Sequence, residues 1–314
     1  PVGRTAAIRA AVSTASMVNI FTTNVNARLL RSFSLAEDTT DGWCQEADLA
    51  NFLTQDRDRL QPSSAVQKLP RGKEATHATR SDVLESYKLA RYASQFVVDE
   101  QDIIDDALSA LTQMPDAMGE RARMLRPDLV YSILLANGNL DQDTTALFHA
   151  NHNNTQALAL NETNIETVIA AMENQTDDGV SLNVRPTHII TAPGLRFTAA
   201  QLFGSVERRP GGNTDRLGNI NPLPNVAVRS DARIGANGVT DPESGTAYTG
   251  AATRWYLAGN GPTIEVGYLA GSGRAPSLRS QALSQGMWGI GWDVKMDVAA
   301  KALAYQALQL GNST

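Results

Sequence analysis

Apolar and polar positions alternate along the chain with periods that predict a small number of regular elements. The clearest is a helix over 114–138, where apolar residues recur every three or four positions and form one stripe: Met114, Met118, Ala122, Leu125, Leu129 and Ile133. Pro115 suits the first turn of this helix, and Gly138 suits its end. Pro127 removes an interior hydrogen bond, but the stripe continues in phase beyond it, which predicts a kink instead of a break.

A period of two, typical of strands, runs through 84–100, where Tyr92, Phe96 and Val98 share one parity. Together with 56–70 it predicts a long β-hairpin, whose polar tip carries Arg71, Lys73, Glu74, His77 and Arg80. A two-stranded hairpin is marginally stable alone in water, so a long one is expected to lie against another surface. A neighbouring subunit is the candidate for that surface.

The N-terminal segment 14–36 is less decisive. Met17, Ile20, Val25 and Leu29 fall at mixed helical spacings, which allows a helix. An arm that packs on other parts of an assembly fits the same pattern equally well, and both interpretations stay open at this point.

Downstream, shorter elements alternate in type. We predict a helix over 161–175 and another over 194–204. We predict a buried strand over 185–193, and surface loops over 208–225 and 231–253 around a strand over 225–230. The inward face of the first helix is expected to carry Ile165, Val168, Ile169 and Met172.

The last third of the chain adds three apolar segments. Segments 253–259 and 262–271 are predicted to pair as strands across an Asn-Gly-Pro turn. The segment 286–308 begins as a strand with Trp288 and Trp292 and ends as either a strand or a helix. The layout is α+β, with strands drawn from distant parts of the chain.

Composition and charge narrow the class of protein. Hydrophobic residues make up 42% of the 314 residues, which predicts a folded chain. No apolar run approaches the roughly 20 residues of a membrane span, so we expect no membrane association. The formal charge is −6, from 27 basic and 33 acidic residues, which argues against a surface that wraps nucleic acid. Cys44 is the only cysteine and is interpreted as a structural thiol.

The candidate chemistry centres on the nonamer "ALFHANHNN", 146–154, which holds His149 and His152. A zinc site would need a third ligand, such as His188, and a helical zinc motif would place its histidines four apart around a glutamate. The alternative is a connector whose imidazoles and amides satisfy backbone groups. No nucleophile elbow, P-loop or dinucleotide motif is present in the sequence, so we expect no catalytic site, metal or cofactor.

The order of segments resembles a known family. A hairpin entering "YKLARYASQFVVDEQDIIDD", a long helix and then "ALFHANHNN" resemble the major capsid proteins of Mu-like tailed phages and prophages. The later segments "TRWYLAGNGPTIEVGYLAG" and "WDVKMDVAAKALAY" follow in that family's order, so the resemblance spans about residues 57–306. It implies the Hong Kong 97-type capsid fold.

The resemblance also implies a domain plan. An N-terminal arm would occupy 1–55, an extended loop 56–100, a peripheral domain with a spine helix 101–150 and 276–314, and an axial domain 151–275. Contacts between subunits would involve the loop tip and the strand after it, with Arg71, Lys73, Glu74, Arg80 and Tyr92 as candidates.

The implied function is a major head protein that assembles with itself into pentamers and hexamers of an icosahedral shell. The shell encloses double-stranded DNA without reading its sequence. A portal, a scaffold or maturation protease and a decoration protein are the implied partners, with assembly in the bacterial cytoplasm and residence in the virion. A tail tube or decoration protein, and a histidine-dependent metalloenzyme, are the alternatives.

Two details of the family are expectations here. Pro1 would suit a terminus left by an assembly protease, and trimming of the chain by design explains it equally well. Lys73 would be the residue for covalent cross-linking between subunits, although the loop tip does not match the lysine–asparagine pair of one branch of the fold.

Overall fold

The computed structural model describes most of the chain. The described residues are 15–62, 68–69, 71–72, 80–99, 101, 108–177, 179–204, 207–208, 219–221, 226–281 and 289–312. Within them, side chains are described except at 15–21, 58–62, 80–83, 108–112, 207–208 and 219–220.

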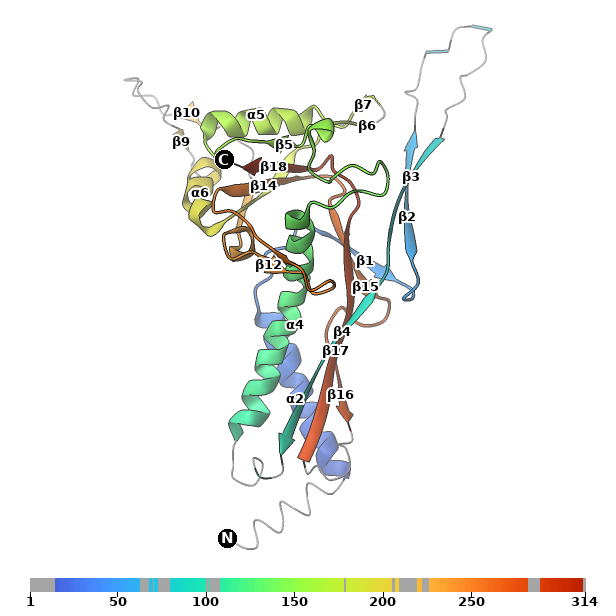
Figure 1. Ribbon diagram of the computed structural model, residues 1–314, viewed down its shortest axis with the longest axis vertical. Helices are drawn as coiled ribbons and strands as arrows, with labels where there is room; N and C mark the ends of the chain where they lie inside the picture. The colour runs from blue at the N-terminus through green and yellow to red at the C-terminus, as the bar shows by residue number, and fades with distance from the viewer. Residues whose placement is uncertain are drawn as a thin grey trace, which may run out of the picture.

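The described elements form two five-stranded sheets, four helices and several short strand pairs (Figure 1). The helices are α2 (Ala15–Leu35), α4 (Leu108–Ala136), α5 (Glu162–Glu173) and α6 (Arg196–Gly204), with short 3-10 helices η1 (Ala150–His152), η2 (Pro193–Leu195) and η3 (Ala232–Ile234). The first sheet holds β1 (Gln45–Leu49), β4 (Ala90–Asp99), β15 (Ile264–Leu269), β16 (Ser277–Gln281) and β17 (Gly289–Ala302). The second holds β5 (Thr155–Gln156), β8 (Pro186–Thr191), β11 (Ala227–Ser230), β14 (Arg254–Gly259) and β18 (Leu308–Asn312).

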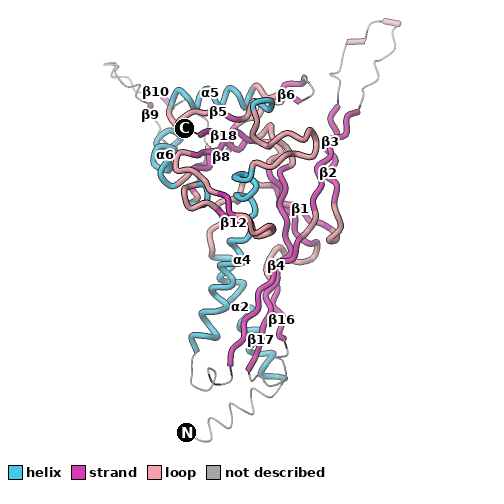
Figure 2. The backbone as a smooth tube through the Cα atoms, in the orientation of Figure 1, coloured by secondary structure: helices cyan, strands magenta, loops and turns pink. Residues whose placement is uncertain are grey.

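The remaining strands pair two by two, outside the sheets. They are β2 (Gln55–Pro62) with β3 (Arg80–Tyr87), β6 (Thr176–Asp177) with β7 (Val180–Ser181), β9 (Glu207–Arg208) with β10 (Asn219–Ile220), and β12 (Val239–Thr240) with β13 (Ala247–Tyr248). Figure 2 shows the resulting shape: a stem of two helices and long strands, a broader head, and the β2–β3 hairpin projecting at the side.

The stem is built on the close contact of α2 with α4. Gly119 of α4 lies directly against α2, and a β-carbon added there would overlap the carbonyl oxygen of Leu29 and lie 2.9 Å from the Cβ of Ser32. Arg28 adds an ion pair with Asp116, at 3.0 Å. Residues 15–35 therefore form a helix that packs within its own chain.

The long helix α4 differs from the prediction at both ends. It begins by Leu108, so Pro115 lies inside it and not in its first turn. It continues through Pro127 unbroken, as the stripe predicts. It ends at Ala136, where Asn137 adopts the left-handed conformation (φ 49°) that the sequence suggested for Gly138. Met114 is 45% exposed, so it is not the core residue we expected.

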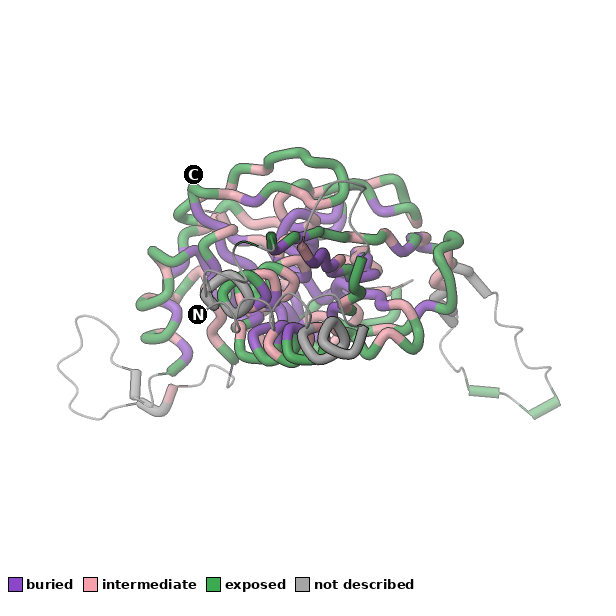
Figure 3. Tube along the Cα trace, turned by 90° about the horizontal axis from the view of Figure 1, so that it is seen from below, coloured by how far each residue is buried: buried purple, intermediate pink, exposed green. Residues whose placement is uncertain are grey.

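One face of the first sheet covers these two helices. Phe96 of β4 stacks on Trp292 of β17 with ring centroids 5.1 Å apart, in a cluster with Val25 and Leu29 of α2. β4 and β17 pair over ten residues, from Gly289 opposite Asp99 to Val298 opposite Ala90. The C-terminal segment that sequence left open between strand and helix is thus the strand β17. Seen from below, the buried residues gather between the layers (Figure 3).

The second sheet is covered on both faces. One face joins the main core through Ile190, Tyr256 and Leu308. The other packs against α5 and α6 through Ile189, Trp255 and Leu257. The buried side of α5 carries Ile165, Val168 and Met172, with Ile169 at its margin, which confirms the predicted inward face.

The predicted pairing of 253–259 with 262–271 is wrong. β14 pairs with β8 and β18 in the second sheet, whereas β15 pairs with β1 and β17 in the first. Both strands are buried along almost their whole length, so each needs a neighbour on either side. The segment 260–263 therefore carries the chain between the sheets. A second link, 303–307, returns it from β17 to β18. Backbone hydrogen bonds join the two links at both ends: Gly259 N, at the end of β14, donates to Ala307 O at 2.8 Å, and Leu303 N donates to Thr263 O at 2.9 Å.

The predicted hairpin exists, but its second strand is divided. β3 pairs with β2 from Gln55 opposite Tyr87 to Pro62 opposite Arg80. After Lys88 and Leu89 the chain continues as β4, which joins the first sheet. The expected support for the hairpin thus comes partly from its own subunit. The tip residues Lys73, Glu74 and His77 lie outside the described residues.

The predicted loop 231–253 contains the short helix η3 and the strand pair β12–β13. Asp241 accepts hydrogen bonds from the backbone of Glu243 and Ser244, and the β12–β13 pair closes the loop. Gly250 packs so closely on Ile234 that a β-carbon would overlap its carbonyl oxygen. Within the part of the chain that the structure describes, none of the helices has the length and apolar character of a bilayer span.

Replacement of Gly119 tests the stem. We expect Gly119→Ala to lower the free energy of unfolding by about 1–3 kcal/mol, because the added methyl group forces α2 away from α4. The matched control is Gly138→Ala, since a β-carbon there meets nothing within 4 Å and should change stability by less than about 0.5 kcal/mol. Denaturant unfolding of the purified chain measures both, and equal effects would contradict the close packing.

Candidate assembly site: the anchored hairpin and the polar junctions

The β2–β3 hairpin is fixed to the body at its root by a first charged cluster. Arg57 donates to Glu265 of β15 at 2.6 Å, and the hydroxyl of Tyr87 donates to the same carboxylate oxygen. The Glu265 residue is only 9% exposed. Burial and the hydrogen bond with Glu265 raise the pKa of Tyr87 well above its usual value. A carboxylate with two donors in a partly dry site holds both hairpin strands to the first sheet.

A second charged cluster lies beside the first at the same root, because Glu85 is opposite Arg57 in the hairpin and Lys301 is opposite Glu265 in the first sheet. Lys301 of β17 lies 3.5 Å from a carboxylate oxygen of Glu85 and 3.0 Å from Asp141. The backbone N–H of Gln142 donates to Glu85, and that of Ser86 donates to Asp141. β3 is therefore tied both to β17 and to the loop after α4. The two clusters fix the direction in which the hairpin leaves the body.

The five residues proposed from sequence as contacts between subunits are distributed along this hairpin and the strand after it. Arg71 is exposed, Arg80 begins β3, and the side chains of Lys73, Glu74 and Arg80 lie outside the described set. Tyr92 is half-buried and packs against the core of its own subunit, where burial raises its pKa to about 12. The two root clusters were missed by sequence reasoning, since the partners in their ion pairs lie more than 200 residues apart in the first cluster, Arg57 with Glu265, and also in the second, Glu85 with Lys301.

The nonamer 146–154 is a connector. His152 is buried, with Nε2 2.6 Å from Asp143 and Nδ1 3.2 Å from the carbonyl oxygen of Leu147, and its ring stacks on Tyr305 at 3.8 Å. The side chain of Asn154 donates to Leu147 O at 2.7 Å and accepts from the backbone N–H of His149. These side chains therefore satisfy backbone groups, as predicted for a connector and not for a metal site.

The three histidines of the metal hypothesis do not come together. His149 caps η1 by accepting from the backbone N–H of Asn151, and His188 lies in β8 beside Gly42. Burial, together with the positive charge of Arg229, lowers the pKa of His188. Among the described residues, which include all three, no group of three His, Cys, Asp or Glu side chains is placed to hold a metal ion.

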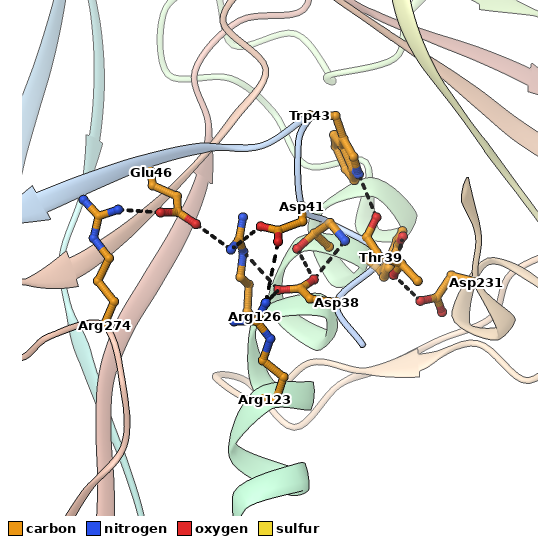
Figure 4. A network of polar contacts seen from close by, with 11 residues as sticks. Asp38, Thr39, Asp41, Trp43, Glu46, Arg123, Arg126, Asp231 and Arg274 are labelled. Carbon is orange, nitrogen blue, oxygen red and sulfur yellow. Dashed lines mark hydrogen bonds and ion pairs between the residues drawn. The ribbon is translucent and has the colours of Figure 1, made fainter. Parts of the chain in front are cut away.

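The segment 38–46, between α2 and β1, forms the central polar junction (Figure 4). Arg126 of α4, only 3% exposed, binds Glu46 at 2.6 Å and Asp41 at 3.2 Å and lies 3.5 Å from Asp38. Arg123 lies 3.4 Å from the fully buried Asp38. On the far side of Glu46, the partly exposed Arg274 forms a further ion pair.

The same segment also reaches the second sheet and its loops. Thr39 donates to Asp231 at 2.5 Å and accepts from the hydroxyl of Tyr131 at 2.9 Å. Gly42, with φ 91°, leaves room for the imidazole of His188. Cys44 lies at the margin of the main core, where burial raises the pKa of its thiol well above the usual value, as expected of a structural thiol. The junction thus joins both sheets to α4.

The buried position of Arg126 predicts a large effect of its removal. We expect Arg126→Met to lower the free energy of unfolding by about 3–5 kcal/mol, because Asp38 and its neighbours lose their buried counter-charge. Arg274→Met is the matched control: its side chain is 41% exposed, so the loss should stay below about 1 kcal/mol. Denaturant titration of the two variants decides, and a loss at Arg126 no larger than that at Arg274 would be inconsistent with a buried ion network.

Glu85 gives the hairpin root a defined pH dependence. Burial raises the pKa of Glu85, so the folded chain holds its proton at pH values where the unfolded chain has released it. The contribution of this group to stability is therefore lost as pH rises from the ordinary carboxyl pKa, about 4.3, through the raised value. We expect Glu85→Gln to gain stability relative to the wild type as pH rises from about 4 to about 7. Unfolding titrations across that range measure the difference, and an opposite slope would refute the assignment.

Comparisons with known proteins agree with this architecture. The chain matches the model of the phage capsid protein family over residues 83–310. The capsid of cyanophage P-SCSP1u is similar in structure, with TM-score 0.55, 9% identity and 87% of this chain matched to 86% of that one. The mature capsid of bacteriophage PhiM1 gives TM-score 0.53 at 14% identity, with 89% of this chain matched to 88% of that one. The virus-like particle of Pyrococcus furiosus gives TM-score 0.51 at 10% identity, with 92% of this chain matched to 97% of that one.

These likenesses have different weights. No curated protein matches the sequence. At such low identity the structural matches establish the fold alone, which is the Hong Kong 97-type capsid fold that the sequence predicted. The family match is of another kind, because it covers most of the chain, from β3 to β18. The chain belongs to the phage capsid protein family.

Proposed function

We propose that this chain is the major capsid protein of a tailed phage or prophage, whose copies assemble into the pentamers and hexamers of an icosahedral shell around double-stranded DNA. The observation that carries the proposal is the β2–β3 hairpin. Its strands pair only with each other among the described residues, yet its root is held by buried charges. A protrusion whose root is fixed and whose described strands pair only with each other is suited to contact another subunit.

The hairpin would supply the contacts that the sequence suggested. Arg71, Lys73, Glu74 and Arg80, which lie between β2 and β3 or at the start of β3 in the sequence, would supply charged contacts to a neighbour, and Tyr92 lies in the following strand, β4. A shell subunit needs heterologous contacts that close into rings and also join the rings. Durable contacts of this kind bury about 1,000 Å² or more, and multivalency makes them collectively hard to break.

The domain plan is part of the same proposal. The arm would occupy 1–55, the extended loop 56–100, the peripheral domain 101–150 and 276–314, and the axial domain 151–275. In the structure β18 lies in the second sheet beside β14, and β15 lies in the first beside β17, so strands are exchanged across the proposed boundaries.

The finer identity and the partners are also proposed. The order of the segments along the sequence, from the hairpin to β17, supports a Mu-like capsid protein. A portal, a scaffold or maturation protease and a decoration protein would complete the head, with assembly in the bacterial cytoplasm and residence in the virion. A formal charge of −6 suits a wall that contains DNA without gripping it, and the role requires no catalytic step or cofactor.

Electron microscopy of the purified, concentrated chain tests the proposal. We expect closed shells from the wild type. Rods or isolated trimers would favour a tail tube or decoration protein, and a stable monomer would overturn the proposal. The variant with Arg71, Lys73 and Arg80 all replaced by Glu should fold normally and form few shells. Thr167→Glu on α5 introduces one charge at an exposed position away from the hairpin and is the control for added charge.

A further inference from the structure

Exposed apolar side chains in the head gather at its two ends. Phe197 of α6 is 86% exposed, more than any other large apolar side chain in the described part of the chain. At the β6–β7 hairpin, Val180 is 41% exposed and the adjacent Leu182 is 39% exposed. Figure 1 shows α6 and the β6–β7 hairpin at opposite ends of the layer that contains α5. No function described above uses either group.

Phe197 is presented by a firmly packed helix. Ala199 and Phe203, on the other side of α6, are buried in the core between α5, α6 and the second sheet. Leu195 and Leu202 pack against the same core. The helix that carries the exposed ring is thus fixed by its buried side, so little backbone freedom remains to be lost when a partner covers the ring.

The β6–β7 hairpin is equally well anchored. The backbone N–H of Leu182 donates to Gln175 O at 2.9 Å, which closes the hairpin at its base. The buried side chain of Gln175 donates to His152 O at 2.9 Å and to Asn153 O at 3.2 Å. The polar connector of the nonamer is therefore also the support of this hairpin.

The two ends also differ in charge. The segment 173–185, which contains the β6–β7 hairpin, carries three carboxylates, Glu173, Asp177 and Asp178, against Arg185 alone. The segment 193–204, which contains α6, carries only Arg196, exposed beside Phe197. One end is acidic and apolar, and the other is basic and apolar, so the two are complementary.

We propose that Phe197 and Arg196 of one subunit pack against Val180 and Leu182 of the β6–β7 hairpin in the next subunit of the same ring. A ring of five or six closes only if one surface of each subunit meets a different surface of its neighbour, and these two patches belong to elements at opposite ends of the head (Figure 1). The root of the β2–β3 hairpin lies on the same side of the molecule as β6–β7 (Figure 1), so one neighbour receives both. This inference rests on the proposed function, since it needs rings of identical subunits.

Disulfide trapping tests the contact directly. Cys44 is the only cysteine, so Cys44→Ala gives a cysteine-free background, in which Phe197→Cys is combined with Val180→Cys or, separately, with Leu182→Cys. Mild oxidation of assembled shells should yield, on non-reducing denaturing gels, a ladder of linked chains that ends at pentamers and hexamers. Phe197→Cys alone is the matched control and should remain monomeric. Monomer bands from closed shells of both pairs would overturn the proposal.

A charge at the contact provides the second measurement. Phe197→Asp should lower the yield of shells by about tenfold or more, because a central apolar anchor is lost and a carboxylate faces the acidic hairpin. Its unfolding curve should match the wild type, since Phe197 is already exposed. Thr167→Asp, exposed on α5 and outside the contact, should assemble normally. A normal yield from Phe197→Asp would refute the contact, whereas wild-type chain that forms no shells would count against the proposed function itself.

Discussion

The guanidinium of Arg126 lies almost out of solvent between the carboxylates of the 38–46 segment, and the architecture depends on this arrangement. Removing the partners of a buried cation costs several kcal/mol of stability, about 3–5 kcal/mol in typical cases. The segment is therefore held where its carboxylates meet α4. Because 38–46 also contacts β8, η3 and the start of β15, one short stretch fixes the position of both sheets on the long helix. The apolar cores then fill the space that these contacts define.

The same division of tasks recurs at the hairpin root. Apolar burial stabilises the body, whereas the direction of the protruding hairpin is set by carboxylates that each contact more than one partner, Glu265 with Arg57 and Tyr87, and Glu85 with Gln142 and Lys301. Charge pairs are directional and apolar contacts are not, so a subunit that must reach beyond its own core uses polar anchors at the point of departure.

Sequence patterns predicted the elements better than their pairing. The face of α5, the strand at β8 and the continuity of α4 followed from local periodicity. The pairing of β14 with β15 was predicted from the short turn between them, and it was wrong because strands buried on both faces are matched to partners far along the chain. The root clusters and the Arg126 network were beyond sequence for the same reason: their members are isolated charges until the fold brings them together. Phe197 carried no signal in the sequence, because an apolar residue on a short helix is ordinarily buried.

The two short links between the sheets, 260–263 and 303–307, lie side by side, and backbone hydrogen bonds join them at both ends, from Gly259 to Ala307 and from Leu303 to Thr263. Two short connections that lie side by side resist sliding and twisting of one sheet against the other, but they permit rotation about the line through both connections. We expect any change in the angle between stem and head to be a rotation about that single axis. The contacts of the 38–46 segment with both sheets would set the value of this angle. Subunits of one sequence would then fit sites of different curvature by a change in this one angle.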